Sequence, residues 1–526
     1  MSDAGAGVSA AGRPAPEPAP DVDVLVVGGG AAGLVTALQL AKLGHSVHVV
    51  EARERPGGFV GAHELAGIRL DSGAESFATR KGTVAALAAE VGLGDEVVAP
   101  NRAGAWVRWN GGTAPLPAAG ILGIPGVPLA DDVRRVIGWG GSLRAYLDRL
   151  MPLLRVRPEH DLGDIVRRRM GRRVLDRLVT PVVAGVHSAD PSDVDVRTVA
   201  PGLTQAMTTQ GSLSGAVMAL REQAPAGSQV QGIAGGMHRL IAALEEQLAF
   251  YGGTLETGTR VLSLQRSGEQ GPDEGADARP LWSVELATAT APAAPTSTAP
   301  SAASASTARA SAASASAGPR RVTARALVVA AGFRPALALL AEAGVAALPA
   351  AAAWPEPASV AIATLVVDDA RLDAHPRGTG VLVAPGTTGV TAKALTHSTA
   401  KWSWLAAQLP PHRHVLRLSY GRGGETLVEP ELDTVIADAS TLLGVPLSEA
   451  DVVDSDLVRW DDSLAFATVG HKARVAQLSE AMAAVPGLDV VGAWVSGTGL
   501  AATVEQAKTT ASGIAAELRG DHRLPG

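Results

Sequence analysis

The order of hydrophobic and polar positions is most regular near the start of the chain. Residues 23–27 (DVLVV) form a short strand-like run, residues 34–43 carry apolar positions at helical spacing up to Gly44, and residues 46–50 (SVHVV) form a second run. Short apolar runs favour buried strands, whereas apolar positions three or four residues apart favour a helix. The pattern predicts a strand, a helix and a second strand over residues 23–50.

Glycines at fixed spacing join the first strand to the helix. Gly28, Gly30 and Gly33 fit G-x-G-x-x-G, with Ala31 and Ala32 before the last glycine. The first glycine makes a tight turn, the second lets the backbone approach a pyrophosphate at the helix N-terminus, and the third permits close helix–strand packing. Glu51 ends the second strand, 18 residues after Gly33, and can accept hydrogen bonds from a ribose diol. These features predict a dinucleotide-binding unit.

The next segment indicates which dinucleotide the unit binds. Residues 51–58 (EARERPGG) place Arg55 where it can neutralise pyrophosphate charge, and Gly57 and Gly58 allow the main chain to lie against a cofactor. This E-x-x-x-R-x-G-G continuation resembles FAD-binding proteins of the glutathione-reductase-like, amine-oxidase-like superfamily. The resemblance implies an α/β fold (α+β overall) with a Rossmann-like FAD domain. The sequence has no second strand–GxGxxG–helix unit, so we expect the organic substrate, not NAD(P)H, to reduce the flavin.

Later segments complete the outline of the chain. Residues 281–286 and 321–329 read as strands on either side of a low-complexity stretch, 287–318, which predicts a hairpin with a long loop. Residues 336–354 are rich in alanine and contain Glu342 and Pro349, which favours an ordinary helix after a strand over a membrane-spanning one. Residues 1–21 read as a disordered leader.

Composition narrows the chemistry. The 526 residues include no cysteine, which excludes disulfides, cysteine-ligated metals, a thiol nucleophile and a cysteinyl flavin link, and suits a cytoplasmic location. The formal charge of −7 argues against nucleic acid as a partner. No histidine pattern indicates a metal site. The 46% hydrophobic content is enough for a large core.

One segment has the opposite charge. Between residues 130 and 180, twelve arginines and seven acidic residues give a net charge of +5. A solvated helix surface explains such a run most simply. A surface that meets an anionic membrane, an acidic partner or an acidic substrate is the alternative.

Several later motifs resemble the protoporphyrinogen/coproporphyrinogen oxidase family, in particular its Gram-positive and actinobacterial coproporphyrinogen III oxidase branch. The motifs are residues 71–80 (DSGAESFATR), 185–190 (GVHSAD), 235–237 (GGM), 258–261 (GTRV), 401–402 (KW), 459–460 (RW), 469–471 (VGH) and 497–500 (GTGL). Two departures stand out: Ala74 replaces a proline of the first motif, and Leu500-Ala501-Ala502 lacks the proline usual near the chain's end.

The resemblance implies a non-covalently bound FAD and an activity. The expected reaction is oxidation of coproporphyrinogen III to coproporphyrin III in haem biosynthesis, with dioxygen as acceptor, three flavin cycles and hydrogen peroxide as product. No side chain is predicted as a catalytic acid or base, because the flavin carries the chemistry. Lys393 and Lys401 are the predicted substrate residues. The predicted cofactor-binding residues are Gly28, Gly30, Ala31, Ala32, Gly33, Glu51, Ala52, Arg55, Gly57, Gly58, Gly73, Ala74, Glu75, Ser76, Val261, Trp460, Gly492, Gly499, Leu500 and Ala501.

The predicted domains interleave. The FAD domain takes three parts, and a helical insert and a mixed-sheet substrate domain lie between them. The boundaries are a leader at 1–21, FAD parts at 22–100, 226–345 and 451–520, a hairpin with the helical insert at 101–225, and the substrate domain at 346–450.

Alternatives stay open at this point. Protoporphyrinogen IX is the rival substrate, and a flavin amine oxidase is the rival enzyme. A flavin-bound scaffold that carries porphyrin to the next haem-pathway enzyme is the non-enzymatic reading. The expected partners are a tetrapyrrole and dioxygen, with no nucleic acid and no transmembrane helix, and peripheral membrane contact is the alternative for the arginine-rich segment.

Overall fold

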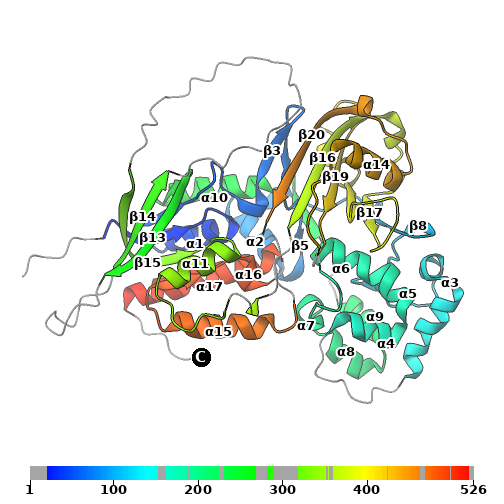
Figure 1. The fold of residues 1–526 in the computed structure, drawn as a ribbon, viewed down its shortest axis with the longest axis horizontal. Coiled ribbons are helices and arrows are strands. Elements are labelled where there is room, and N and C mark those ends of the chain that lie inside the picture. Colours follow the sequence, from blue (N-terminus) through cyan, green and yellow to red (C-terminus); the bar gives the residue numbers. More distant parts are fainter. Residues whose placement is uncertain are drawn as a thin grey trace, which may run out of the picture.

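The fold of the protein is described by a computed structural model (Figure 1). The predicted leader, up to residue 19, and most of the low-complexity loop, residues 289–317, lie outside the described residues. The described residues are 20–151, 161–187, 189–223, 230–267, 281–288, 318–350, 353–354, 359–422, 425–461, 468–497 and 499–520.

The first sheet contains the predicted strand–helix–strand unit. Its order is β12 (Thr254–Glu256), β2 (Val47–Val50), β1 (Val22–Val27), β15 (Arg320–Val329), β14 (Leu281–Thr288) and β13 (Thr259–Ser267), and β21 (Leu488–Val490) also pairs with β15. The strands around β1 are parallel, whereas β13, β14 and β15 are antiparallel. The predicted α/β class and the predicted pairing of the strands that flank the low-complexity loop are therefore confirmed.

Helices cover both faces of this sheet. One core contains α1 (Ala31–Lys42), α2 (Thr83–Glu90), α10 (His238–Phe250) and α17 (Leu500–Arg519). The other contains α11 (Phe333–Glu342), α15 (His471–Ala483) and α16 (Ala493–Ser496). The helix α11 follows β15, as predicted for the alanine-rich segment. None of the helices within the described ranges is long and apolar enough to cross a bilayer.

A second, mixed sheet lies beside the first (Figure 1). The helix α14 (Leu432–Leu443) covers one of its faces with an apolar core. The short helices α12 (Ser398–Lys401) and α13 (Ser403–Ala406) connect two of its strands. Its order is β20 (Val452–Trp460), β16 (Val360–Asp368), β19 (Arg413–Tyr420), β18 (Ala394–His397), β17 (Gly380–Val383), β7 (Trp106–Trp109) and β8 (Gly112–Pro115).

This sheet crosses two of the predicted domain boundaries. The strands β7 and β8 fall within the range predicted as hairpin and helical insert, and β20 falls within the last predicted FAD part. All three are nevertheless strands of the second sheet. Strands that are neighbours in a sheet can be far apart in the sequence, so sequence order alone does not give the boundary. The pairing of β17 with β7 joins segments almost 300 residues apart.

The remaining elements form a helical insert and small connections. The insert has its own apolar core. Its helices are α3 (Asp131–Tyr146), α4 (Leu162–Met170), α5 (Arg172–Val174), α6 (Thr180–His187), α7 (Val196–Val199), α8 (Leu203–Gln210) and α9 (Leu213–Gln223), with a strand pair β9 (Gly120–Ile121) and β10 (Ile124–Pro125). A hairpin of β3 (Ala62–Leu65) and β4 (Ile68–Asp71) and a small sheet of β5 (Phe77–Ala78), β11 (Val230–Ile233) and β6 (Val97–Val98) complete the fold.

Candidate cofactor and substrate site

The glycine turn after β1 is tightly enclosed except at Gly30. A Cβ atom on Gly33 would lie 2.0 Å from the carbonyl oxygen of Gly28, and one on Gly28 would lie 2.6 Å from the carbonyl oxygen of Ala330. Gly28 also has a φ of 115°, which residues with a side chain rarely adopt. A Cβ atom on Gly30 would meet no atom of the described residues within 4 Å. The protein therefore leaves open space at Gly30.

The first turn of α1 fits an anionic group. The helix begins at Ala31, continues through Ala32 and Gly33, and has no acidic residue in its first turn. The first backbone N–H groups of a helix lack partners inside it and lie at the positive end of its dipole. A pyrophosphate would find donors and open space at this helix end. The predicted contacts of residues 30–33 stay predictions that this geometry allows.

Glu51 ties the end of β2 to the glycine turn. Its Oε2 atom accepts a hydrogen bond of 2.7 Å from the N–H of Gly29, and its Oε1 atom accepts one of 2.9 Å from the N–H of Arg53. The N–H of Gly57 donates to the carbonyl of Gly29 over 2.8 Å. Because a carboxylate oxygen can accept more than one hydrogen bond, Glu51 can still receive the hydroxyls of a ribose.

Val261 lies along the strand that contacts Glu51. The N–H of Thr259 donates to the carbonyl of Glu51 over 2.9 Å, and the N–H of Glu51 donates to the carbonyl of Glu256 over 2.8 Å. Val261 follows in the same strand and is half-buried, beside a register shift between β13 and β14. Ala52 is exposed next to Glu51. The residues predicted to contact the adenine and the ribose thus lie near each other, Glu51 after the end of β2 and Val261 close to the start of β13.

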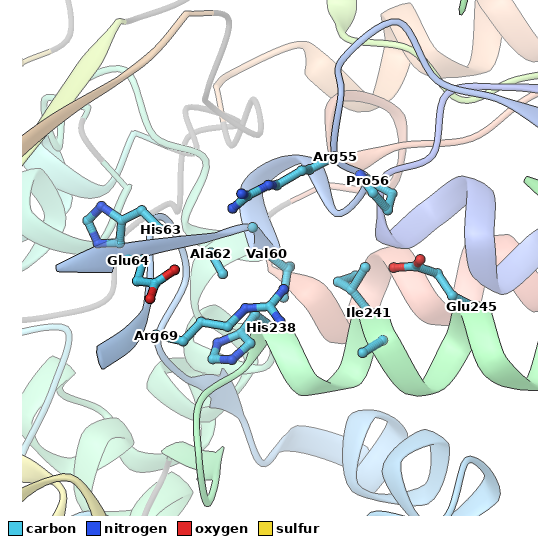
Figure 2. A pocket seen from close by; sticks show the side chains of 12 residues that line it. Arg55, Pro56, Val60, Ala62, His63, Glu64, Arg69, His238, Ile241 and Glu245 are labelled. Carbon is cyan, nitrogen blue, oxygen red and sulfur yellow. The ribbon is translucent and has the colours of Figure 1, made fainter. Parts of the chain in front are cut away.

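The loop of residues 55–58 lies between the glycine turn and α10. A Cβ atom on Gly58 would lie 3.6 Å from the Cα of Gly30, whereas one on Gly57 would lie 3.3 Å from Ile241 of α10. Arg55 lines a pocket of about 410 Å³ on the α10 side of this loop (Figure 2). Its predicted pyrophosphate contact stays a prediction. Figure 2 also labels Arg69, His238 and Glu245 in this pocket.

The segment with the predicted residues Gly73, Ala74, Glu75 and Ser76 packs against the glycine loop. The N–H of Ala74 donates to the carbonyl of Phe59 over 2.8 Å. A Cβ atom on Gly73 would lie 2.2 Å from the same carbonyl oxygen. Only glycine permits this approach, so Gly73 sets the distance between the two segments.

Glu75 and Lys401 contact each other, although the sequence predicted them for two different ligands. The Lys401 Nζ and the Arg417 Nη1 both donate to the Glu75 carboxylate, the latter over 3.0 Å, and the Ser398 hydroxyl donates over 3.2 Å. Burial by itself would raise the pKa of Glu75, but the charges of Lys401 and Arg417 outweigh it and lower the pKa to about 2. The Lys401 ammonium is therefore engaged by the protein, and the carboxylate of Glu75 holds the segment between β4 and β5 against the second sheet.

Trp460 connects the second sheet to the loop of residues 51–61. Its indole Nε1–H donates to the carbonyl of Ser72 over 3.1 Å, and its ring meets that of Phe59 edge to face at 5.2 Å between centroids. The guanidinium of Arg53 lies 5.2 Å from the ring centroid. The predicted cofactor residue Trp460 is thus beside the loop of residues 51–61.

Two glycines near the chain's end open onto the same region. Gly492 has a φ of 147° and precedes α16, and Gly499 has a φ of 99° and precedes α17. Leu500 and Ala501 form the first turn of α17 and are half-buried. The α16 segment contacts the segment after β15 through Trp494, whose Nε1–H donates to the carbonyl of Ala331 over 3.3 Å. Leu500 and Ala501 pack against the core that includes Ala31 and Ala32 at the start of α1.

One contributor was missed by the sequence prediction, Arg417. Arg417 lies in β19 opposite Thr364 and Thr396, and its alternation in the strand could have indicated the face it occupies, but not its partner. Its Nη2 also donates to the carbonyl of Gly73 over 2.6 Å. Trp494, the candidate ring of the amine-oxidase alternative, is 4% exposed.

Lys393 is a buried cation at the start of β18. It is 2% exposed, its N–H donates to the carbonyl of Ser419 over 2.8 Å, and its carbonyl accepts from the N–H of Val383 over 3.0 Å. Burial, helped by the charge of Arg422, lowers the pKa of Lys393 to about 7. The two predicted substrate lysines thus have different surroundings, since Lys401 has the Glu75 carboxylate beside it.

Comparison with known proteins indicates the class of protein that this chain resembles. Residues 31–279 match the family model described as flavin containing amine oxidoreductase. The fold is similar to that of a protein from Exiguobacterium sp. 255-15, provisionally assigned as a protoporphyrinogen oxidase, with a TM-score of 0.76, 24% identity, and coverage of 94% of this chain and 99% of that one. The chain therefore resembles flavin-containing oxidoreductases, in sequence over residues 31–279 and in overall fold.

The curated relatives indicate which branch of the predicted family this chain resembles. The coproporphyrinogen III oxidase of Bacillus subtilis (strain 168) is 24% identical, over 93% of this chain and 97% of its own. That of Mycobacterium tuberculosis (strain ATCC 25618 / H37Rv) is 27% identical, over 91% and 94%. These comparisons confirm the predicted resemblance to the protoporphyrinogen/coproporphyrinogen oxidase family.

Proposed function

We propose that this protein binds FAD non-covalently and oxidises coproporphyrinogen III to coproporphyrin III, with dioxygen as the acceptor. The observation that carries the proposal is similarity to curated coproporphyrinogen III oxidases over almost the whole of both chains. The open N-terminus of α1 at Gly30 and the free acceptor capacity of Glu51 support a dinucleotide form of flavin.

When bound, FAD would supply a two-electron acceptor, so removal of six electrons from the macrocycle needs three cycles and yields three molecules of hydrogen peroxide. The chain's own residues bind and position the cofactor and the substrate. The loops around Gly30, Gly57 and Gly73 hold the cofactor, and Trp460 joins them to the second sheet. Lys393 is the proposed propionate ligand, and Lys401 is left in its pairing with Glu75.

Protoporphyrinogen IX is the second candidate substrate. Its support is the chloroplastic protoporphyrinogen oxidase of Oryza sativa subsp. japonica, which is 36% identical over 37% of this chain and 35% of its own. The amine-oxidase alternative is weaker, because Trp494, the aromatic ring nearest the closing motif, is buried against Phe333 and Trp354. It is not placed to form one wall of an aromatic cage for an amine.

Anaerobic mixing with each candidate substrate tests the proposal. We expect coproporphyrinogen III to bleach the flavin absorbance, and porphyrin fluorescence to grow to completion once air is admitted, because the acceptor is then regenerated. Steady-state rates on protoporphyrinogen IX rank the two porphyrinogens. Binding without bleaching would instead favour a porphyrin-carrying scaffold, and bleaching by simple amines would favour an amine oxidase.

The helical insert carries an exposed apolar stripe framed by arginines. Trp139 is 64% exposed and Leu150 is 73% exposed, and between them Leu143, Tyr146 and Leu147 also lie at the surface. Their spacing places them on one side of α3 and the turn that follows. The exposed arginines nearby are Arg135, Arg149, Arg167, Arg168, Arg172 and Arg173. Aromatic and leucine side chains beside arginines are typical of helices that lie on anionic bilayers.

We therefore propose a cytoplasmic protein that contacts the membrane surface through α3. We expect it to sediment with vesicles containing anionic lipid, and to do so less with rising salt, because part of the attraction is electrostatic. Replacing Trp139 and Leu150 by serine is expected to weaken sedimentation by about tenfold, from the apolar area removed. The matched control is Phe250→Ser, which removes a 78% exposed ring from α10. Equal sedimentation of all three proteins would contradict the membrane contact.

A further inference from the structure

The pocket on the α10 side of the loop of residues 51–61 is separate from the space at Gly30. Its volume of about 410 Å³ lies in the range of small-ligand sites. A Cβ atom on Gly57 would lie 3.3 Å from Ile241, which lines the pocket, whereas one on Gly58 would lie 3.6 Å from the Cα of Gly30. The loop therefore has the glycine turn on one side and the pocket on the other.

A histidine is held in one orientation in the wall of this pocket (Figure 2). His238, the first residue of α10, is 7% exposed. Its ring Nδ1 lies 2.9 Å from Oδ1 of Asp71, and the Asp71 carboxylate also accepts hydrogen bonds of 2.9 Å from the N–H groups of Met237 and His238. Because this carboxylate is an acceptor, Nδ1 of the neutral ring carries the proton and Nε2 is an acceptor.

The turn before α10 is shaped around the Asp71–His238 pair. Gly236 has a φ of 107°, and a Cβ atom there would lie 2.6 Å from the Nδ1 of His238 and 3.1 Å from the Oδ1 of Asp71. Only glycine combines this φ with so close an approach. The backbone thus fixes the direction of the His238 ring as well as its hydrogen bond.

The second ring nitrogen of His238 is available to a ligand. Across the described part of the chain, Nε2 has no hydrogen-bond partner, since the only bond of this ring is the one from Nδ1 to Asp71. An unpaired acceptor on a mostly buried ring is unfavourable. A hydroxyl of a molecule in the pocket would supply the donor.

Arg69 brings a positive charge to the same wall. It lies in β4 two residues before Asp71, so both side chains lie on one face of the β3–β4 hairpin. Figure 2 shows the Arg69 side chain beside His238. Arg69 makes no ion pair or hydrogen bond with the residues that the structure describes. Arg55 lines the pocket from the loop and adds a second positive charge.

Two carboxylates complete the polar lining. Glu64 is exposed and lies opposite Arg69 in the hairpin register, and Glu245 lies two turns along α10 from His238. Burial raises the pKa of Glu245, and the charge of Arg69 opposes this. The pocket thus combines guanidinium groups, which bind oxyanions, with groups that accept hydrogen bonds from hydroxyls.

We propose that this pocket binds a small phosphate-bearing ligand, with the Arg69 guanidinium on the oxyanion and the Nε2 of His238 accepting a hydrogen bond from a hydroxyl of the ligand. This inference goes beyond the proposed function and does not depend on which substrate the flavin oxidises. Hydrogen phosphate, which has a P–OH group, is the smallest ligand of this class. No covalent bond changes on binding.

Calorimetric titration of the flavin-loaded protein with inorganic phosphate and with sulfate tests the site. Both anions are tetrahedral and carry two negative charges at about pH 8, but only phosphate has a hydroxyl that can donate to Nε2. We expect phosphate to bind about fivefold more tightly than sulfate at constant ionic strength, which corresponds to one hydrogen bond. The bound flavin keeps both anions away from the first turn of α1.

Substitutions assign the two contacts. His238→Phe keeps a ring and removes Nε2, so it is expected to abolish the preference for phosphate and to retain sulfate binding. Arg69→Gln is expected to weaken the binding of both anions about tenfold, from the loss of a charge-assisted hydrogen bond. Because Arg69 is exposed, this variant tests the site even if His238→Phe fails to fold. The control is Arg321→Gln, an exposed arginine of β15 that should leave both affinities unchanged.

The outcomes separate this site from the proposed function. Equal affinities for phosphate and sulfate in the wild type, or a preference that survives His238→Phe, would overturn the contact with Nε2. Unchanged binding in Arg69→Gln, or no binding of either anion, would overturn the site itself. Oxidation of coproporphyrinogen is judged independently, by bleaching of the flavin.

Discussion

Replacing Gly30 by valine is expected to abolish flavin binding while the protein stays folded. Gly30 has a φ of −74° and a ψ of 175°, which any residue adopts, and a Cβ atom there meets nothing within 4 Å in the part of the chain that the structure describes. The valine side chain would therefore fill only the space before α1. We expect at least tenfold weaker flavin binding, or more than about 1.4 kcal/mol, measured by flavin absorbance of the purified protein and by titration of the flavin-free form.

The neighbouring glycine provides the contrast. Gly33→Ala would place a methyl group 2.0 Å from the carbonyl oxygen of Gly28 and 3.0 Å from the Cβ of Ala330. That substitution is expected to lower the thermal midpoint of the flavin-free protein, whereas Gly30→Val should leave it unchanged. A Gly30→Val protein with a full complement of flavin would reject the placement of the cofactor at this helix end.

Replacing Glu75 by glutamine is expected to destabilise the fold by about 3 kcal/mol, since it leaves Lys401 and Arg417 buried without their counterion. The measurement is the free energy of unfolding in urea at neutral pH. The matched control is Glu505→Gln, which removes the carboxylate of an exposed pair with Lys81, whose side chains are 54% and 68% exposed. That change is expected to cost less than about 1 kcal/mol.

The same residue gives the stability a defined pH dependence. The pKa of Glu75 is lowered from 4.5 to about 2 in the folded protein, so its contribution is complete above the unfolded value. It is lost as the pH falls from about 4.5 toward 2, where the carboxylate becomes protonated. We expect the stability difference between wild type and Glu75→Gln to shrink over that interval. A constant difference would show that the carboxylate does not owe its effect to charge.

The cofactor half of the site is largely predictable because its parts are local. Gly28 and Gly33 are five residues apart and contact each other, and the Glu51 carboxylate bonds to the backbone of Gly29. The hydrophobic periodicity of the strands and the helix, and the glycine spacing of the turn, specify these contacts within one segment of the sequence.

The substrate half depends on strand pairing between distant segments. Lys393 and Lys401 looked alike in the sequence, as isolated lysines near aromatic or apolar neighbours. The structure places Lys401 on Glu75, 326 residues away, and Lys393 beside another cation. A side chain's protonation and role follow from burial and neighbouring charge, which sequence spacing does not encode.

The sequence by itself thus determined the class of fold, the dinucleotide-binding unit and the family resemblance, because each is carried by short motifs whose residues contact one another. Only the tertiary structure decided which charged residues lie together and how deeply they are buried. The physical reason is that electrostatic energy depends on distance and burial in space, and the second sheet brings together Glu75, Lys401 and Arg417 at one place and Lys393 and Arg422 at another.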